Sequence, residues 1–494
     1  MSKNASINLH VIAHQAMANY GFLAKYPIEV IREAQKLIPQ LDNGTFRKSF
    51  EDMTPLLWSS IDNVDSQDLD QLEYCEKTNR QEIHVFIAIA DVDSYVEYGS
   101  AIDEHAAHNG TSVYAEVEVF PMLPERLSSD LSSLIEGKDR LAIVVDYYVL
   151  RSGELRPGGV RRAVVRNKAK LVYEPVGEWL DQEGAIPEKI QKMPDLKEQV
   201  LLQMEAANRL HQFRLNNGAL ELETIETSVK VEDGQVADLI IRKKNTARKI
   251  IENFMIAANR TMVACLEKSK FPYIQRILRT PERWDRIVAV AASYGEEISA
   301  DPDPKALSDF LVRQHKRDPG HFPDLSISIV KLIGAAEYDL IEPGGKTNPG
   351  HFGLAVHDYT HSTAPNRRYV DIVIQRLLKA ALDKKNPPYD VKTLKTIAGW
   401  CTDRDRMSKK VERFMVKVAG AVLLSGRVGE IFEGIITGAS DKGTYVRLLN
   451  PPVEGRVMRN HRGMNVGDKV WVKLIKMDAR QGYIDFEGAR RRVS

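Results

Sequence analysis

The apolar pattern along the chain changes character twice, near residue 55 and again near residue 425. Before the first change, apolar residues in Tyr26–Leu41 recur near a 3.6-residue period, which predicts a helix. A second helix is expected around Leu9–Tyr20, so a helix-turn-helix type of domain is one interpretation of this segment. Because 494 residues are too many for one small core, these changes predict three domains: 1–54, 55–424 and 425–494.

The middle segment begins with strand patterns and continues mainly with helical ones. Runs rich in β-branched and aromatic residues predict strands at Ile83–Ile89, Ser112–Val119 and Leu141–Leu150. Longer amphipathic runs predict helices at Leu196–Leu215, Thr246–Ser269, Pro281–Gly295, Arg367–Leu382 and Thr393–Leu424. This order favours one large α+β domain without internal repeats.

The last segment is typical of a small β-barrel. Short β runs separated by Gly, Asp-Lys-Gly and Pro-Pro turns indicate five strands, which suits an OB-fold that binds single-stranded nucleic acid. Phe432 is expected in the barrel core, whereas for Tyr445 a core position and stacking on a base remain equally open. Four basic side chains lie near Tyr445 in this segment: Lys442, Arg447, Arg456 and Arg459. With a net charge of only +1, any positive surface for nucleic acid must be local.

Cysteine content and hydropathy exclude several classes of protein. The three cysteines form no CxxC pair, which argues against a zinc site or a disulfide framework. The sequence contains no run of about 18 apolar residues and no signal-peptide pattern, so we expect no membrane span. A cytoplasmic protein is therefore expected.

Four aspartates within nine residues form the most chemically distinctive cluster of the chain: Asp62, Asp65, Asp68 and Asp70. Neighbouring carboxylates repel one another unless a cation neutralises them, and Mg²⁺ prefers oxygen ligands of this kind. Such a site can promote phosphodiester cleavage. An EF-hand is excluded because its glycine and its spacing are missing. A solvated acidic loop remains open from this cluster alone.

Longer runs of the middle segment resemble the RNase II (RNB) family of exoribonucleases. One is FIAIADVDSYVEYGSAIDEHAAHNGTSVY, and another is HFGLAVHDYTHSTAPNRRYVDIVIQRLLKA, with NGALELETIE and IIENFMIAANR between them. The resemblance extends in order from about Asp62 to Leu424 and implies an RNB-type catalytic domain followed by an RNA-binding OB barrel. It also implies a Mg²⁺-dependent 3′→5′ exoribonuclease, which degrades single-stranded RNA with a free 3′ end processively to nucleoside 5′-monophosphates.

The same resemblance implies the ligands of the metal. The family motif ID-x5-D-x-DD places Mg²⁺ on three carboxylates: Asp62, Asp68 and Asp70. Asp70 matches the aspartate most critical for cleavage. Gln71 stands where the family has a fourth aspartate, so the number of metals is in question. Asp65, or with less support Glu73, is a candidate for the missing carboxylate.

Further site residues follow from matched positions. Arg367 matches the arginine that contacts the scissile phosphate, a role suited to a planar fork of donors. Three residues match contacts to the RNA end: Tyr114, Tyr173 and Glu412. His351 and His361 are interpreted as structural or RNA-bonding residues rather than metal ligands.

The chain departs from the family pattern at two further places. Asn366 replaces an apolar residue before the arginine, and the helical segment 1–54 stands where the family has two cold-shock barrels. We therefore expect a different N-terminal device to guide RNA. Two alternatives are an RNA-binding relative with weakened catalysis, which Gln71 would explain, and another metal-dependent phosphodiesterase or phosphatase. A monomer is expected, because a threaded channel needs no symmetry partner.

Overall fold

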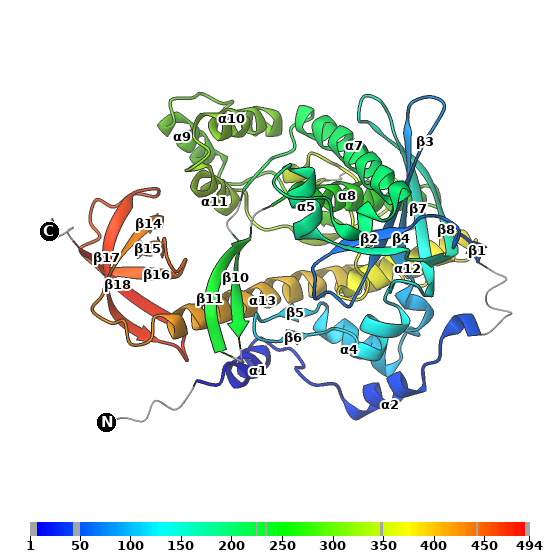
Figure 1. Ribbon diagram of the computed structural model, residues 1–494, viewed down its shortest axis with the longest axis horizontal. Helices are drawn as coiled ribbons and strands as arrows, with labels where there is room; N and C mark the ends of the chain where they lie inside the picture. Colours follow the sequence, from blue (N-terminus) through cyan, green and yellow to red (C-terminus); the bar gives the residue numbers. More distant parts are fainter. Residues whose placement is uncertain are drawn as a thin grey trace.

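A computed structural model describes residues 7–42, 50–223, 226–232, 235–242, 244–345, 349–440 and 443–489. The chain forms a central α+β body and a C-terminal β-barrel, joined by one long helix (Figure 1). This architecture confirms the fold class predicted from the sequence. Among the described residues, no helix has both the length and the apolar character needed to cross a bilayer.

A seven-stranded sheet forms the centre of the body, with the strand order β1-β8-β7-β4-β3-β2-β9. The strands are β1 (Glu51–Asp52), β2 (Ser59–Asp62), β3 (Gln71–Lys77), β4 (Ile83–Ala90), β7 (Asp139–Val149), β8 (Leu155–Arg166) and β9 (Ala169–Val172). β3 pairs antiparallel with both β2 and β4, so the C-terminal end of β2 and the N-terminal end of β3 lie side by side at one end of the strands. The acidic segment that connects them is held at this end of the sheet.

Helices pack on the sheet and complete the main core. They are α4 (Ala101–Asn109), α5 (Tyr173–Leu180), α6 (Glu188–Gln191), α7 (Pro194–Asn216), α8 (Thr246–Lys268), α12 (Tyr369–Leu382) and α13 (Val391–Leu423). α8 contacts strands β7 and β8 and also helices α5, α7 and α12, which explains why more than half of its residues are buried. Ile87, Phe254 and Ile374 come from the sheet, α8 and α12, and all are completely buried.

A separate helical unit packs beside the barrel (Figure 1). It consists of α9 (Trp284–Ser293), α10 (Pro304–Arg317) and α11 (Phe322–Ile333), followed by β13 (Glu337–Ile341), which pairs with β12 (Tyr273–Ile277). Ile287, Phe310 and Ile329 belong to a core of its own. Short 3₁₀ or π turns complete the body: η1 (Gln40–Asp42), η2 (Val92–Ser94), η3 (Arg126–Leu131) and η4 (Phe352–Leu354).

The C-terminal segment is a closed five-stranded barrel, as the turn pattern predicted. Its strands are β14 (Ile431–Ser440), β15 (Gly443–Leu448), β16 (Glu454–Arg459), β17 (Lys469–Asp478) and β18 (Tyr483–Ala489). Phe432 lies in the barrel core against Phe486, as expected. Tyr445 is half-buried and alternates with buried neighbours, which places its side chain on the outer side of β15. Lys442 lies outside the described residues.

The two N-terminal helices, α1 (Leu9–Asn19) and α2 (Ile28–Lys36), form at the positions predicted. α1 buries Ala13 and Met17 in a cluster that includes Met415 of α13. α2 contributes Val30 and Ala34 to the main core. Both helices therefore share apolar cores with the body, and the domain boundaries inferred from the sequence stay a prediction.

Two segments differ from the secondary structure expected. In place of one strand at Ser112–Val119, a tight turn separates the two-residue strands β5 (Val113–Tyr114) and β6 (Val119–Phe120). The chain reverses at Glu116, which has φ of +65°, and this conformation interrupts an extended run. The helix expected from Arg367 begins at Tyr369. The backbone carbonyl of Arg367 accepts from the N–H of Ser112, and Arg368 forms a β-bridge with Thr111, so neither residue joins the helix.

Candidate active site

The acidic segment meets the sheet at two of its aspartates. Asp62 is the last residue of β2, and Asp70 immediately precedes β3. Both side chains are buried, with 9% and 3% exposure, whereas Asp65 is exposed and Asp68 half-buried. This end of the sheet therefore carries two carboxylates inside the protein and two near its surface.

Burial and mutual repulsion make these carboxyls unusually weak acids. Burial raises the pKa of Asp62 to about 6, despite hydrogen bonds from Ser60 and Gln71 that lower it. Burial also raises the pKa of Asp70 to about 7, with a further upward contribution from Asp68. Without a cation, the cluster thus holds protons close to neutral pH, and a divalent cation would displace them.

The oxygen atoms present fit a hard divalent cation. Oδ2 of Asp62 is buried and has no hydrogen-bond partner within the described part of the chain. Asp62, Asp68 and Asp70 offer carboxylate oxygens, which are the ligands that Mg²⁺ prefers. Among the described residues, no group of three or more acidic, histidine or cysteine side chains is placed to hold a metal ion. Magnesium usually keeps several waters and binds substrate phosphates in addition to one or two carboxylates.

Gln71, at the position of the family's fourth aspartate, contacts the cluster through its amide. Nε2 of Gln71 donates to Oδ1 of Asp62 over 3.3 Å. Glu73, two residues further along β3, is fully buried, and neither of its oxygens has a partner among the described residues. Burial raises the pKa of Glu73 well above its usual value, with a further upward contribution from Asp62. Its role as a replacement carboxylate stays a prediction.

The loop before α12 brings Arg367 to Asp70. The backbone N–H of Asn366 donates to Oδ1 of Asp70 over 3.0 Å, and Nε of Arg367 lies 3.3 Å from Oδ2. The Arg367 side chain remains 46% exposed and can reach a ligand. Arg368 instead pairs with the buried Asp371 through Nε at 2.9 Å and Nη2 at 2.7 Å, which is a structural role.

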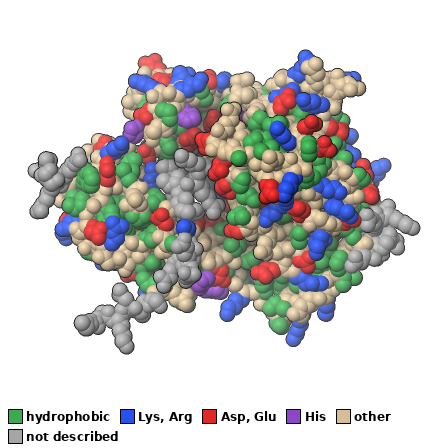
Figure 2. Space-filling view, viewed as in Figure 1, with side chains coloured by type: hydrophobic (Ala, Val, Ile, Leu, Met, Phe, Trp, Pro, Cys, Tyr) green, Lys and Arg blue, Asp and Glu red, His purple; other side chains and the backbone are tan. Residues whose placement is uncertain are grey.

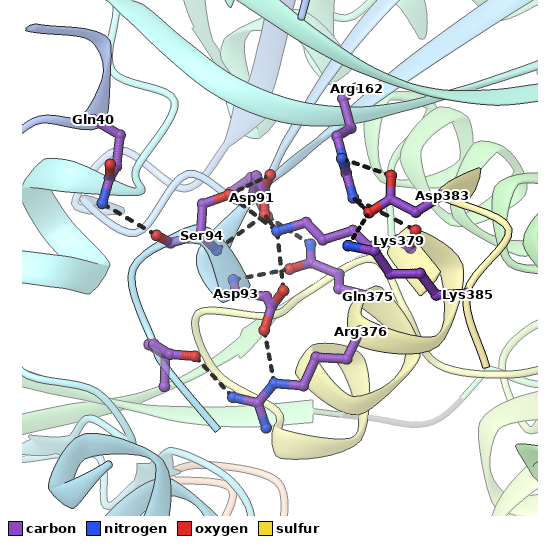
Figure 3. A network of polar contacts seen from close by, with 12 residues as sticks. Gln40, Asp91, Asp93, Ser94, Arg162, Gln375, Arg376, Lys379, Asp383 and Lys385 are labelled. Carbon is purple, nitrogen blue, oxygen red and sulfur yellow. Dashed lines mark hydrogen bonds and ion pairs between the residues drawn. The ribbon is translucent and has the colours of Figure 1, made fainter. Parts of the chain in front are cut away.

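Buried ion pairs fix α12, which follows this loop (Figure 3). Arg376 pairs with Asp93 at 2.7 Å and with Asp103 at 2.8 Å. Lys379 lies 2.5 Å from Asp91 and 3.0 Å from Asp93. These aspartates belong to the turn after β4 and to α4, so the network ties α12 to the sheet and holds the Arg367 loop in register with Asp70.

A cavity of about 700 Å³ opens beside the acidic cluster. Asp68, Ser112, Tyr114 and Asn366 are among the residues that line it. Tyr114 is 38% exposed. Its backbone forms a hydrogen bond to the carboxyl of Glu412, which places this residue of α13 next to Tyr114. An aromatic ring beside carboxylates suits the end of a single strand.

Tyr173 is the first residue of α5 and directly follows Val172, the strand partner of Asp62. The guanidinium of Arg248 lies 4.3 Å from the centre of its ring and also donates to Asn63 over 3.1 Å. Sequence reasoning missed Arg248 because it belongs to a helical run without a motif. It also missed Lys170, whose Nζ donates to the carbonyl of Ser66 over 2.6 Å and so holds the acidic segment.

A second concave surface lies between the barrel and α13. This groove, of about 780 Å³, is lined by basic side chains that include Lys410, Arg413 and Lys417. They are exposed at i, i+3 and i+7 on one face of the helix. Tyr483, which is 63% exposed, also lines the groove. On the face shown in Figure 2, acidic and basic side chains are interspersed.

The two candidate histidines form hydrogen bonds within the protein. Nδ1 of His361 lies 2.7 Å from the hydroxyl of Tyr338, and Nδ1 of His351 accepts from the N–H of Leu354 over 3.2 Å. Burial lowers the pKa of both rings, that of His351 to about 4. Both are therefore neutral near pH 7, as expected for residues that are not part of the acidic cluster.

Comparison with known families agrees with this arrangement. A family model described as an RNB domain matches residues 50–384, which is more than half of the chain. The chain belongs to the RNB family. A second model, an RNase II-type exonuclease C-terminal S1 domain, matches residues 430–489 and covers the barrel of this RNB protein.

Relatives of this RNB protein include ribonuclease R of Thermotoga maritima. It is 30% identical over 500 residues, which cover 94% of this chain and 68% of that protein. The chain spans between 60% and 73% of the length of four curated relatives. RNase R of Mycoplasma genitalium, in complex with ribose-methylated single-stranded RNA, has a TM-score of 0.86 at 21% identity and covers 98% and 78% of the two chains. Yeast Ssd1, described as a pseudonuclease, has a TM-score of 0.69 at 16% identity, with 94% and 57% covered.

Proposed function

We propose that this chain is a 3′→5′ exoribonuclease that hydrolyses single-stranded RNA to nucleoside 5′-monophosphates. The observation that carries the proposal is the contact of Arg367 and the Asn366 backbone with the buried Asp70, beside a cavity with an aromatic wall. Membership of the RNB family supports the same activity. So does the name of the relatives, ribonuclease R.

Magnesium is the proposed cofactor, held by Asp62, Asp68 and Asp70. When bound there, it supplies a Lewis acid that lowers the pKa of water and neutralises charge on the phosphate. Support comes from the unpartnered oxygen of Asp62 and from the raised pKa values of Asp62 and Asp70, since both favour a partner with positive charge.

The other residues around the cavity have separate proposed roles in binding the phosphate and the bases. Arg367 is placed to donate to the phosphate oxygens as negative charge develops, where a preorganised donor has its greatest effect. Tyr114 stacks on a terminal base, while Glu412 and Tyr173 contact the last nucleotides. Contacts to the 2′-hydroxyl would distinguish RNA from DNA.

The basic groove on α13 and the barrel is the proposed path of the upstream RNA. Lys410, Arg413 and Lys417 would neutralise successive phosphates in the groove, and Tyr483, which lines it, or Tyr445 on the outer side of β15 would stack on bases. A protein that threads a free 3′ end in this way acts processively and needs no second copy, so we propose a monomer. We also propose that it acts in the cytoplasm.

A time course on 5′-labelled single-stranded RNA, with and without Mg²⁺, tests the proposal on a denaturing gel. We expect shortening from the 3′ end that requires Mg²⁺, and we expect Asp70→Asn to abolish it while RNA binding persists. An RNA blocked at its 3′ end is the matched control substrate and should survive. Intact RNA at high enzyme concentration, with binding retained, would instead favour the weakened RNA-binding relative.

A further inference from the structure

A further concave surface of about 610 Å³ adjoins the basic groove and extends along α1. Its walls are one face of α1, Phe414 of α13 and the turn between β17 and β18. We call it the α1 groove. Tyr20, Phe414 and Gln481 line both grooves, so the two surfaces meet at these residues. A chain that lies in the basic groove can therefore continue along α1.

The face of α1 that lines this groove is exposed and carries amide side chains. Asn8, Val11, Gln15 and Asn19 follow one another at intervals of three and four residues, and all four are exposed. Nε2 of Gln15 donates to Oδ1 of Asn19 over 2.9 Å. Each of these two amides keeps further donors or acceptors, and amides of this kind can bond to the edges of unpaired bases.

The positive side chains of the two grooves have no acidic partner. Lys410, Arg413 and Lys417 line the basic groove, Arg480 lines the α1 groove, and all four are exposed. Within the described part of the chain, no carboxylate oxygen lies within 4.0 Å of a nitrogen of these side chains. Of the described residues that line the two grooves, only Glu454 is acidic. The combined surface is therefore complementary in charge to a phosphate backbone.

Aromatic rings lie where the two grooves meet. Tyr20 and Phe414 are half-buried and line both grooves, while Tyr483 lines the basic groove and is 63% exposed. Unpaired cations beside aromatic rings are typical of surfaces that bind a single strand, since the cations neutralise phosphates and the rings contact bases. The α1 groove therefore fits single-stranded RNA.

The walls of the α1 groove are held in place by packing. Ile7, just before α1, packs against the barrel core, and Met17 of α1 shares an apolar cluster with α13. The turn between β17 and β18 approaches α13 closely at Gly482, where a Cβ would lie 3.3 Å from Lys417 and 3.5 Å from Phe414. The groove is thus formed before any ligand binds.

We propose that the α1 groove binds single-stranded RNA upstream of the basic groove. Arg480 contacts a phosphate, and Gln15 and Asn19 contact the edges of bases. The inference rests on the proposed exoribonuclease function and extends the RNA path beyond the basic groove. An RNA long enough to reach α1 is therefore bound more tightly than one that ends in the basic groove.

The test compares the wild-type protein with Arg480→Gln. RNA affinity is measured by anisotropy for 5′-labelled oligoadenylates of increasing length, in EDTA so that cleavage does not interfere. The variant should bind short oligomers as the wild type does and long ones about three- to tenfold more weakly, through loss of one charge-assisted contact. For long oligomers, the slope of log affinity against log salt concentration should fall in magnitude by about 0.7.

A second variant, Gln15→Glu, places a carboxylate in the α1 groove. The position is exposed, and glutamate has nearly the helix propensity of glutamine, so the fold and the melting temperature should be retained. It should also weaken the binding of long oligomers and spare that of short ones. Arg462→Gln is the matched control, because it removes an exposed arginine of the barrel that lines neither groove. It should match the wild type at every length.

The inference would be overturned if Arg480→Gln and Gln15→Glu bound RNA of every length as the wild type does. An equal loss in Arg480→Gln and Arg462→Gln would also overturn it, because general charge would then explain the effect. So would a loss that is as large for short oligomers as for long ones, since it would place Arg480 on the part of the path nearer the cavity. A failure of the proposed function would appear separately, as absence of Mg²⁺-dependent cleavage by the wild-type protein.

Discussion

Replacing Asp70 by Asn should stabilise the metal-free protein while abolishing its activity. Asp70 is 3% exposed and accepts from the backbone of Asn366 over 3.0 Å, a bond that an asparagine oxygen can also accept. The substitution removes a buried charge but keeps the shape of the side chain. When no cation is bound, removing the negative charge of Asp70 from this cluster therefore stabilises the folded protein.

The size of the effect follows from the pKa of Asp70, which burial raises from 3.8 to about 7. Between these two values the folded protein binds a proton that the unfolded chain has released, so wild-type stability falls as pH rises through this window. At 1.36 kcal/mol per unit, the accumulated cost at pH 8 is roughly 4 kcal/mol, and 2–4 kcal/mol allows for relaxation of the site. The Asp70→Asn variant would escape this cost, because its amide carries no charge at any pH in this range.

Urea denaturation in EDTA at several pH values measures the difference. The free energies of unfolding of wild type and Asp70→Asn should nearly coincide at pH 4 and diverge steadily up to about pH 7, with the variant more stable. Asp62 titrates in both proteins, so its contribution largely cancels. If the unfolding free energies of the two proteins changed in parallel with pH across this range, the reasoning would be refuted. That result would mean that ionisation of Asp70 does not destabilise the folded protein.

Four further outcomes are expected. Gln71→Asp restores a fourth carboxylate and should raise Mg²⁺ affinity about tenfold by calorimetry, through added ligand charge; unchanged affinity would exclude this position from the metal site. Arg367→Lys should lower kcat about a hundredfold with little change in KM, because lysine lacks the planar fork; a pure KM effect would contradict this role. Tyr114→Ala should weaken RNA binding by about 1–3 kcal/mol, whereas Tyr114→Phe should retain most of it. Lys379→Met leaves the fully buried Asp91 without its cation and should lower the free energy of unfolding by about 3–5 kcal/mol in denaturant titrations.

The sequence predicted those parts of the structure that rest on local pattern. Five short strands with turn residues predicted the barrel, and the helical period located α8 within one residue at its end. The prediction failed at Ser112–Val119, because the turn at Glu116 depends on a backbone conformation that composition does not signal. Periodicity also predicted helix for Arg367 and Arg368, but the side chain of Arg367 contacts Asp70, almost 300 positions away, and Arg368 forms a β-bridge with Thr111.

The candidate site also contains residues that a local motif predicted and residues that only the structure shows. Motif spacing identified the aspartates and Arg367, and the structure brings Asp70 and Arg367 into contact. No motif marked Lys170 or Arg248, since their roles arise only when distant segments meet. Asn366 was recognised in the sequence as a departure from the family pattern, whereas the hydrogen bond between its Oδ1 and Ser132 appears only in the folded structure.

Helix α13 runs without interruption from Val391 to Leu423, and a helix of that length spans roughly 50 Å. It passes Glu412 beside the cavity and enters the barrel, where Gly420 packs against Val453 with no room for a larger side chain. A continuous helix, and not a flexible linker, therefore connects the body to the barrel. If upstream RNA follows the proposed path, this helix fixes the interval between the barrel and the cavity, and an RNA too short to span that interval would contact only one of the two.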